Sequence, residues 1–138
     1  MADIGDYAGL SDPVKNILVV DDDEASRILF TEVFSAGGYT VYPFGNPFEA
    51  LENYASVHPC ALVVDYRLPG LSGLDFVDCL RSSYDVDIPV FGLSAEPDFA
   101  HRDDVKERFD HVFLKPTSYY HVLDTVNAYL SGTRELGR

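Results

Sequence analysis

The sequence is short of basic residues. Its 138 residues include 10 lysines and arginines against 23 aspartates and glutamates, a formal net charge of −13. Nucleic acids and anionic membrane surfaces both bind basic faces that neutralise phosphates, so the charge argues against either partner. The sequence also lacks an apolar run near the roughly 18 residues of a membrane span, and its acidic N-terminal MADIGDYAGLSD does not resemble a secretory signal. We therefore expect a cytoplasmic protein that binds neither nucleic acid nor membrane.

Cysteine is equally scarce. Cys60 and Cys79 have neither CxxC spacing nor a companion histidine cluster, which favours buried free thiols over a disulfide or a zinc site. With 46% hydrophobic and 13% aromatic residues the chain is globular, and its length suits one domain. We expect that domain over residues 15–131, after a flexible leader over 1–14 and before a short polar tail over 132–138.

Short apolar runs alternate with helical patterns along the chain. We expect strands over 17–20, 39–44, 61–64, 88–93 and 111–114, and helices from about 25 to 36, 47 to 57, 74 to 81, 97 to about 108, and from 119. The inward stripes of the first and last helices should be Ile28, Leu29, Val33 and Phe34, and Val122, Leu123, Val126 and Leu130. Five strands alternating with five helices predict an α/β fold, a doubly wound parallel sheet with right-handed crossovers.

Polar side chains follow four of these strands. They are Asp21 and Asp22 after the first strand, Asp65 after the third, Ser94 after the fourth and Lys115 after the fifth. Parallel strands end at one edge of the sheet, where open α/β folds bind ligands, so these side chains should meet there. Taken alone, Asp65 is equally well explained as a turn-initiating residue. The other strand ends favour a functional site.

The expected chemistry of this site is phosphoryl transfer. Three converging carboxylates repel one another unless a cation lies among them, and Mg²⁺ suits a site with few protein ligands and room for water and phosphate oxygens. Lys115 adds a positive charge and Ser94 a hydroxyl donor. Such a cluster can let one carboxylate attack phosphorus while the cations neutralise the transferred oxygens.

These residues resemble a known family, the receiver domain of bacterial response regulators in the CheY-like superfamily. The resemblance covers about residues 14 to 130. It rests on the Asp21-Asp22 pair, the Asp65 loop with its LPGLSG continuation, the Ser94-Ala95 step and the Lys115-Pro116 pair, which appear in order and at family spacing. It implies a flavodoxin-like sheet of order 2-1-3-4-5.

The resemblance also implies roles for the site residues. Asp65 would accept a phosphoryl group from a sensor histidine kinase or a histidine phosphotransfer protein, and Ser94 and Lys115 would hold the phosphoryl oxygens. The Mg²⁺ ligands, with Mn²⁺ as a possible substitute metal, would be Asp22, Asp65, the backbone carbonyl of Arg67 and, through water, Asp21. The output would be protein binding through the face of the fourth helix, fifth strand and fifth helix, with phosphorylation-linked homodimerisation as one outcome.

The sequence departs from the family pattern near its fifth strand. Val112 stands where an aromatic is usual, Thr117 where Phe is usual, and 109–111 replace small residues. Val112 has no ring to swing, so we expect activation to move residues 94–108 instead. Phe113 should point to the opposite face of its strand and not substitute.

Two further expectations concern the mouth of the site and the alternatives to a receiver. Arg67 and Glu96 should project over the site and pair. One alternative is a haloacid-dehalogenase-like phosphatase with Asp21 as nucleophile, although the acidic pair that such enzymes need after the lysine is missing. The other is a receiver-like binding module that is not phosphorylated. The four histidines are scattered, and none is a convincing phosphodonor.

Overall fold

The computed structural model describes residues 15–132 and confirms the expected alternation of strands and helices. The strands are β1 (Asn16–Val20), β2 (Thr40–Phe44), β3 (Ala61–Asp65), β4 (Val90–Ser94) and β5 (His111–Leu114). The helices are α2 (Glu24–Ala36), α3 (Pro47–Val57), α4 (Gly73–Ser83), the short 3-10 helix η1 (Phe99–His101), α5 (Asp103–Lys106) and α6 (Tyr119–Ser131). The expected leader over 1–14, and the expected tail from 133 onwards, lie outside the described residues.

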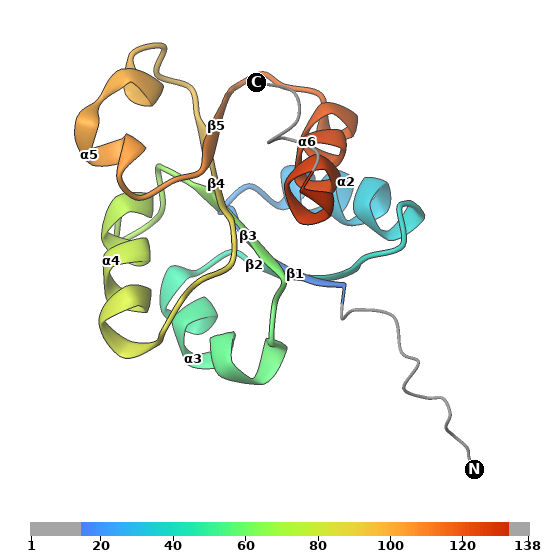
Figure 1. Cartoon of the computed structure of the whole chain (residues 1–138), viewed down its shortest axis with the longest axis horizontal. Helices are drawn as coiled ribbons and strands as arrows, with labels where there is room; N and C mark the ends of the chain where they lie inside the picture. The colour runs from blue at the N-terminus through green and yellow to red at the C-terminus, as the bar shows by residue number, and fades with distance from the viewer. Residues whose placement is uncertain (1–14, 133–138) are drawn as a thin grey trace.

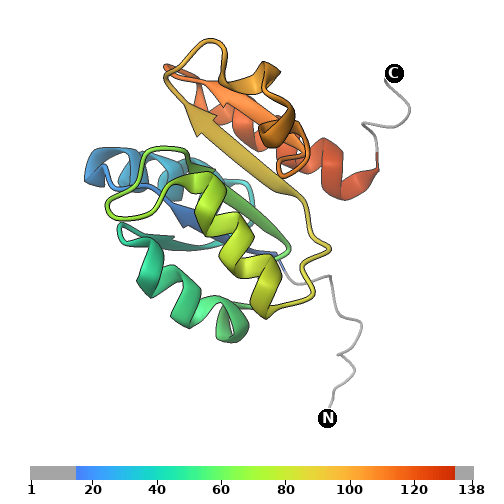
Figure 2. The ribbon, with the colours of Figure 1, turned by 90° about the vertical axis from the view of Figure 1, so that its left-hand side faces the viewer.

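The five strands form one parallel sheet of order β2-β1-β3-β4-β5, as the family resemblance implied. Helices α3, α4 and α5 cover one face, and α2 and α6 cover the other (Figure 1). Figure 2 shows the first group in front of the sheet. The prediction of a doubly wound α/β fold is therefore confirmed.

Two apolar layers hold the helices to the sheet. Alternate residues of the central strands face opposite layers: Leu62 and Val64 pack under α3 and α4, and Val63 packs under α2 and α6. All five residues of β3 are buried, as expected for a central strand of a parallel sheet. Phe113 lies in the α2 and α6 layer whereas Val112 packs in the other, which confirms their predicted opposite orientations.

Side-chain caps fix where the helices begin. Asp23 accepts a hydrogen bond from the Ser26 amide at the start of α2, and Asn46 accepts from the Phe48 amide at the start of α3. Ser72 caps α4 in the same way. Each cap satisfies an amide that the first turn of a helix leaves unpaired. The caps therefore set where each helix starts relative to the strand ends.

Part of the predicted core is wrong. Ile28 and Leu29 are 52% and 51% exposed, and Leu130 is 38% exposed. In α2 the buried pair is Phe30 and Phe34, whose rings stack with centroids 4.1 Å apart. Residues four apart lie on one face of a helix, so once these large rings face the sheet, Ile28 and Leu29 must point away from it.

The fourth predicted helix exists but is shorter than its predicted range of 97 to about 108 and is interrupted. Within residues 97–108 the helical parts are η1 and the four-residue α5, separated by Arg102, and the buried side chains are those of Phe99 and Val105. Strand β4 begins at Val90, two residues later than expected, since Pro89 has no amide hydrogen for the sheet.

Two expectations from composition can be compared with the structure. Both cysteines are free, but Cys60 is half-buried and Cys79 is exposed, so the expectation that both are buried is wrong. In the part of the chain that the structure describes, no helix has the length and apolarity of a membrane span.

Candidate functional site

The carboxyl ends of four strands bring the predicted site residues together. Asp21 directly follows β1, Asp65 and Ser94 are the last residues of β3 and β4, and Lys115 directly follows β5. Within residues 15–132 the buried polar or charged residues are Asp21, Asp65 and Ser94, at 2%, 6% and 2% exposed. Burying polar groups costs free energy unless partners compensate, so their concentration at one edge marks a functional site.

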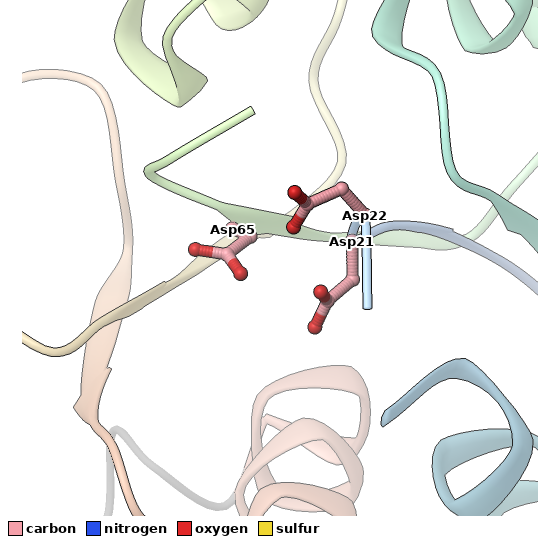
Figure 3. Close-up of side chains that lie close together, drawn as sticks. All are labelled: Asp21, Asp22 and Asp65. Atoms are coloured by element: carbon pink, nitrogen blue, oxygen red, sulfur yellow. The ribbon is translucent and has the colours of Figure 1, made fainter. Parts of the chain in front are cut away.

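Three carboxylates form the centre of the site. One oxygen from each of Asp21, Asp22 and Asp65 lies within 4.8 Å of the others. Figure 3 shows the three side chains lying close together at the ends of β1 and β3. Asp22 is exposed while the other two are buried, so water reaches the cluster from the Asp22 side.

One lysine partly neutralises these acids. Lys115 Nζ lies 2.6 Å from Oδ2 of Asp65 and 3.8 Å from Oδ2 of Asp21. Burial lowers the pKa of Lys115, but its hydrogen bond to Asp65 and the charges of Asp65 and Asp21 outweigh that effect and raise the pKa overall. Lys115 therefore stays charged at neutral pH, and the cluster still holds three carboxylates for one ammonium.

The pKa of Asp21 reflects its burial and the excess of carboxylates over ammonium groups in the cluster. Burial is the main reason that its pKa is raised from 3.8 to about 6, and the charge of Asp65 raises it further. The Asp23 amide, which donates to Asp21 Oδ1 at 3.0 Å, and the charge of Lys115 partly offset the effect. A cation between the carboxylates would relieve the repulsion that remains.

The loop after β3 folds back over Asp65. The Arg67 amide donates to Asp65 Oδ1 at 3.2 Å, and the Gly73 amide donates to the Tyr66 carbonyl at 2.7 Å. A Cβ atom at position 73 would lie 2.6 Å from the Asp65 carbonyl oxygen, closer than real Cβ atoms come. Gly73 therefore lets α4 begin against the backbone of Asp65, a constraint that sequence reasoning did not identify although this glycine lies in the loop it singled out.

The ends of β4 and β5 complete the site. The Glu96 amide donates to Ser94 Oγ at 3.0 Å, and the Lys115 amide donates to the Ser94 carbonyl at 2.8 Å. The serine hydroxyl hydrogen can therefore be donated to an incoming oxygen. Above the mouth, the Arg67 guanidinium pairs with the Glu96 carboxylate, which confirms the expected ion pair.

An open depression adjoins Lys115. Its volume is about 450 Å³, and it lies between the start of α2 and the loop from β5 to α6. Its lining includes Asp23, Ser26, Leu29, Ala95, Pro116 and Tyr119. The exposed Leu29, wrongly expected in the core, is thus part of the surface around the site.

Comparison with known proteins yields a family match and close relatives. The model of the response regulator receiver domain matches residues 17–127. The response regulator MprA of Mycobacterium ulcerans is 39% identical over 125 residues, which cover 86% of this chain and 51% of that protein. The chain thus spans about half the length of the curated relatives it matches.

Solved structures have the same architecture. The receiver domain of the Francisella response regulator 1452 is 25% identical with a TM-score of 0.77, and the match covers 86% of this chain and 98% of that one. The response regulator TrrA of Thermotoga maritima, solved in complex with Mg²⁺ and BeF, is 26% identical with a TM-score of 0.73, and the match covers 83% and 97%.

Proposed function

The chain belongs to the response regulator receiver domains of two-component signalling, and from this premise we propose that Asp65 is its phosphoacceptor. The proposal rests on the hydrogen-bonded ion pair between Lys115 Nζ and Oδ2 of the buried Asp65, which are 2.6 Å apart. The carboxylates of Asp21 and Asp22 lie beside this pair. Asp65 is the one acid of the three that directly contacts the lysine at hydrogen-bonding distance. We place the receiver domain at residues 15–131.

The proposed reaction is a phosphoryl transfer to the side chain of Asp65. A carboxylate oxygen attacks the phosphorus of a phosphohistidine, the P–N bond breaks as the P–O bond forms, and the imidazole leaves with the electron pair. Lys115 stays charged and donates to the transferred oxygens. The Ser94 hydroxyl donates to another of these oxygens, so both side chains stabilise charge that grows on the phosphoryl group.

The residues present fit a magnesium ion. Two buried carboxylates and one exposed carboxylate, with a single lysine to balance them, form a donor set of hard oxygens. Asp22, Asp65 and the backbone carbonyl of Arg67 would hold the ion, with Asp21 acting through water, and Mn²⁺ would substitute. When bound, Mg²⁺ supplies positive charge that neutralises carboxylate and phosphoryl oxygens.

The partners follow from this chemistry. The phosphodonor is a sensor histidine kinase or a histidine phosphotransfer protein, and we place the chain in the cytoplasm because kinases draw on ATP there. The output is binding of a downstream protein to the face that α5, β5 and α6 share, with homodimerisation as one form of that output. Beyond signalling, we propose only slow self-phosphorylation from small phosphodonors and slow autodephosphorylation.

Phosphate uptake tests the assignment of Asp65. Intact-protein mass spectrometry after incubation with acetyl phosphate and Mg²⁺ should show one added phosphate on the wild type and on the control Asp124→Asn, and none on Asp65→Asn. Stoichiometric uptake by Asp65→Asn would overturn the assignment. Loss of a covalent intermediate in Asp21→Asn alone would favour the phosphatase alternative, and no uptake by the wild type would favour a module that is not phosphorylated.

A further inference from the structure

Small residues leave room between β4 and β5, and a ring from elsewhere fills it. Val112 lies opposite Gly92 in the sheet register. A Cβ atom at position 92 would lie 3.1 Å from the Phe109 ring, so that ring packs directly on the Gly92 backbone. Phe109 is 6% exposed and precedes β5. The aromatic volume beside Val112 therefore comes from a residue outside the strand.

Phe109 is the first of three rings that lead to the phosphoacceptor. Its centroid lies 6.1 Å from that of Phe99, a residue of η1 that is 1% exposed. The Phe99 centroid lies in turn 4.3 Å from that of Tyr66, the residue directly after Asp65. Both separations are short enough for direct contact between the rings. The rings thus connect the loop before β5 with the end of β3.

The Tyr66 end of this row is held in place by the backbone. The Tyr66 amide donates to the Leu93 carbonyl at 2.8 Å, and its carbonyl accepts from the Gly73 amide at 2.7 Å. These bonds fix Tyr66 between β4 and the start of α4. The ring of Tyr66, against which Phe99 packs, therefore starts from a backbone position that is tied to both elements.

The exposed side chain of Arg102 lies over the rings of Tyr66 and Phe99. Its guanidinium carbon lies 5.9 Å from the Tyr66 ring centroid and 5.7 Å from that of Phe99, within range of cation–π attraction. Asp104 holds the guanidinium through two hydrogen bonds of 3.1 and 2.7 Å. Arg102 links η1 to α5, so the same residue connects both short helices to Tyr66.

The segment that carries these contacts has little structure of its own. Helix η1 has three residues and α5 has four, and helices this short are not stable in isolation. Figure 1 shows the segment on the α4 side of the sheet, next to β4 and β5. Its position must therefore be set by packing contacts such as the one between Phe99 and Tyr66.

We propose that the stack of Tyr66, Phe99 and Arg102 couples the phosphorylation state of Asp65 to the position of residues 95–108. The proposal rests on the proposed function of Asp65. A phosphoryl group adds acceptor oxygens beside Ser94, whose Oγ accepts from the Glu96 amide, and a new bond from this hydroxyl changes the turn that leads to Phe99. The Tyr66 backbone is tied to β4 and α4, so a movement of residues 95–108 changes the contacts that Phe99 and Arg102 make with Tyr66. These contacts therefore differ between the phosphorylated and unphosphorylated states, and such a difference is what allows phosphorylation to shift their populations.

Amide hydrogen exchange with and without a phosphoryl mimic tests this coupling. Wild-type protein with Mg²⁺ and beryllofluoride should change its exchange rates over 95–108 relative to Mg²⁺ alone. In Tyr66→Leu, which keeps apolar volume but removes the ring, the change over 99–106 should fall at least threefold while beryllofluoride still binds by ¹⁹F NMR. Tyr66→Phe keeps the ring, removes only the hydroxyl that accepts from Arg102 Nη1 at 3.5 Å, and should retain the response if the ring contacts carry the coupling.

Two further variants guard against a folding defect and a general aromatic effect. Arg102→Gln removes an exposed cation and should also reduce the response over 99–106. Tyr54→Leu removes a ring from the separate Tyr54–Tyr84 pair, whose centroids lie 4.9 Å apart, and should leave the response intact. A full response over 99–106 in Tyr66→Leu, or an equal loss of response in Tyr54→Leu, would overturn the coupling. Failure of wild-type protein to bind beryllofluoride would overturn the proposed function itself, and the coupling with it.

Discussion

Replacing Asp21 by Asn should stabilise the metal-free protein. Asp21 is 2% exposed, and its pKa is raised to about 6, mainly by burial. A rise from 3.8 to about 6 corresponds to roughly 3 kcal/mol in favour of the neutral form. Asparagine is neutral and its side-chain oxygen can still accept from the Asp23 amide. We expect the free energy of unfolding at pH 7 to rise by about 1–3 kcal/mol, and the melting temperature by roughly 3–10 °C.

The effect should depend on pH with a defined sign. Because the folded-state pKa of Asp21 lies above its unfolded value, the folded protein binds the extra proton between about pH 3.8 and pH 6. The unfolding free energy of the wild type therefore falls, relative to that of Asp21→Asn, as the pH rises through this window. The two proteins should be nearly equal in stability near pH 4, and the variant should gain its full advantage near pH 7.

Chemical denaturation in EDTA at several pH values measures this difference. Adding millimolar Mg²⁺ should stabilise the wild type, because the ion binds the folded state, and should stabilise Asp21→Asn less. Asp124→Asn removes an exposed charge from α6 and is the matched control for net charge. Lower stability of Asp21→Asn than of the wild type without metal at pH 7, or a stability difference that does not change between pH 4 and pH 7, would show that the buried charge of Asp21 does not destabilise the fold.

Three further predictions concern the loops of the site. Arg67→Ala removes an exposed ion pair worth about 1 kcal/mol or less, so it should change the dephosphorylation rate but not the melting temperature. Dephosphorylation rates equal to that of the wild type in both this variant and Glu96→Ala would show that the ion pair does not control access to the site. Gly73→Ala places a Cβ atom 2.6 Å from a backbone oxygen and should lower the unfolding free energy in urea by about 1–3 kcal/mol, whereas unchanged stability would mean that α4 shifts freely. A crystal structure with a phosphoryl mimic should show residues 94–108 displaced and the Val112 rotamer unchanged, and the reverse result would contradict the expected route of activation.

The sequence by itself determined the strand ends and the chemistry placed on them. Short apolar runs followed by Asp65, Ser94 or Lys115 are local patterns, and the parallel topology they indicate places their carboxyl ends at one edge. The ion pair of Arg67 and Glu96 was also predictable, because each lies two residues beyond a strand end whose position was known.

Only the tertiary structure decided which side chains are buried and which segments far apart in sequence meet. Apolar spacing in α2 did not distinguish Leu29 from Phe30, because the choice depends on which rings fit the sheet surface. The adjacent Asp21 and Asp22 are equally acidic in sequence, yet only the first is buried, since its orientation follows from the direction in which the chain leaves β1. The contact between Tyr66 and Phe99 joins the loop after β3 to helix η1, and no local pattern encodes it, because it arises when β3 and β4 pair and bring the segments that follow them together.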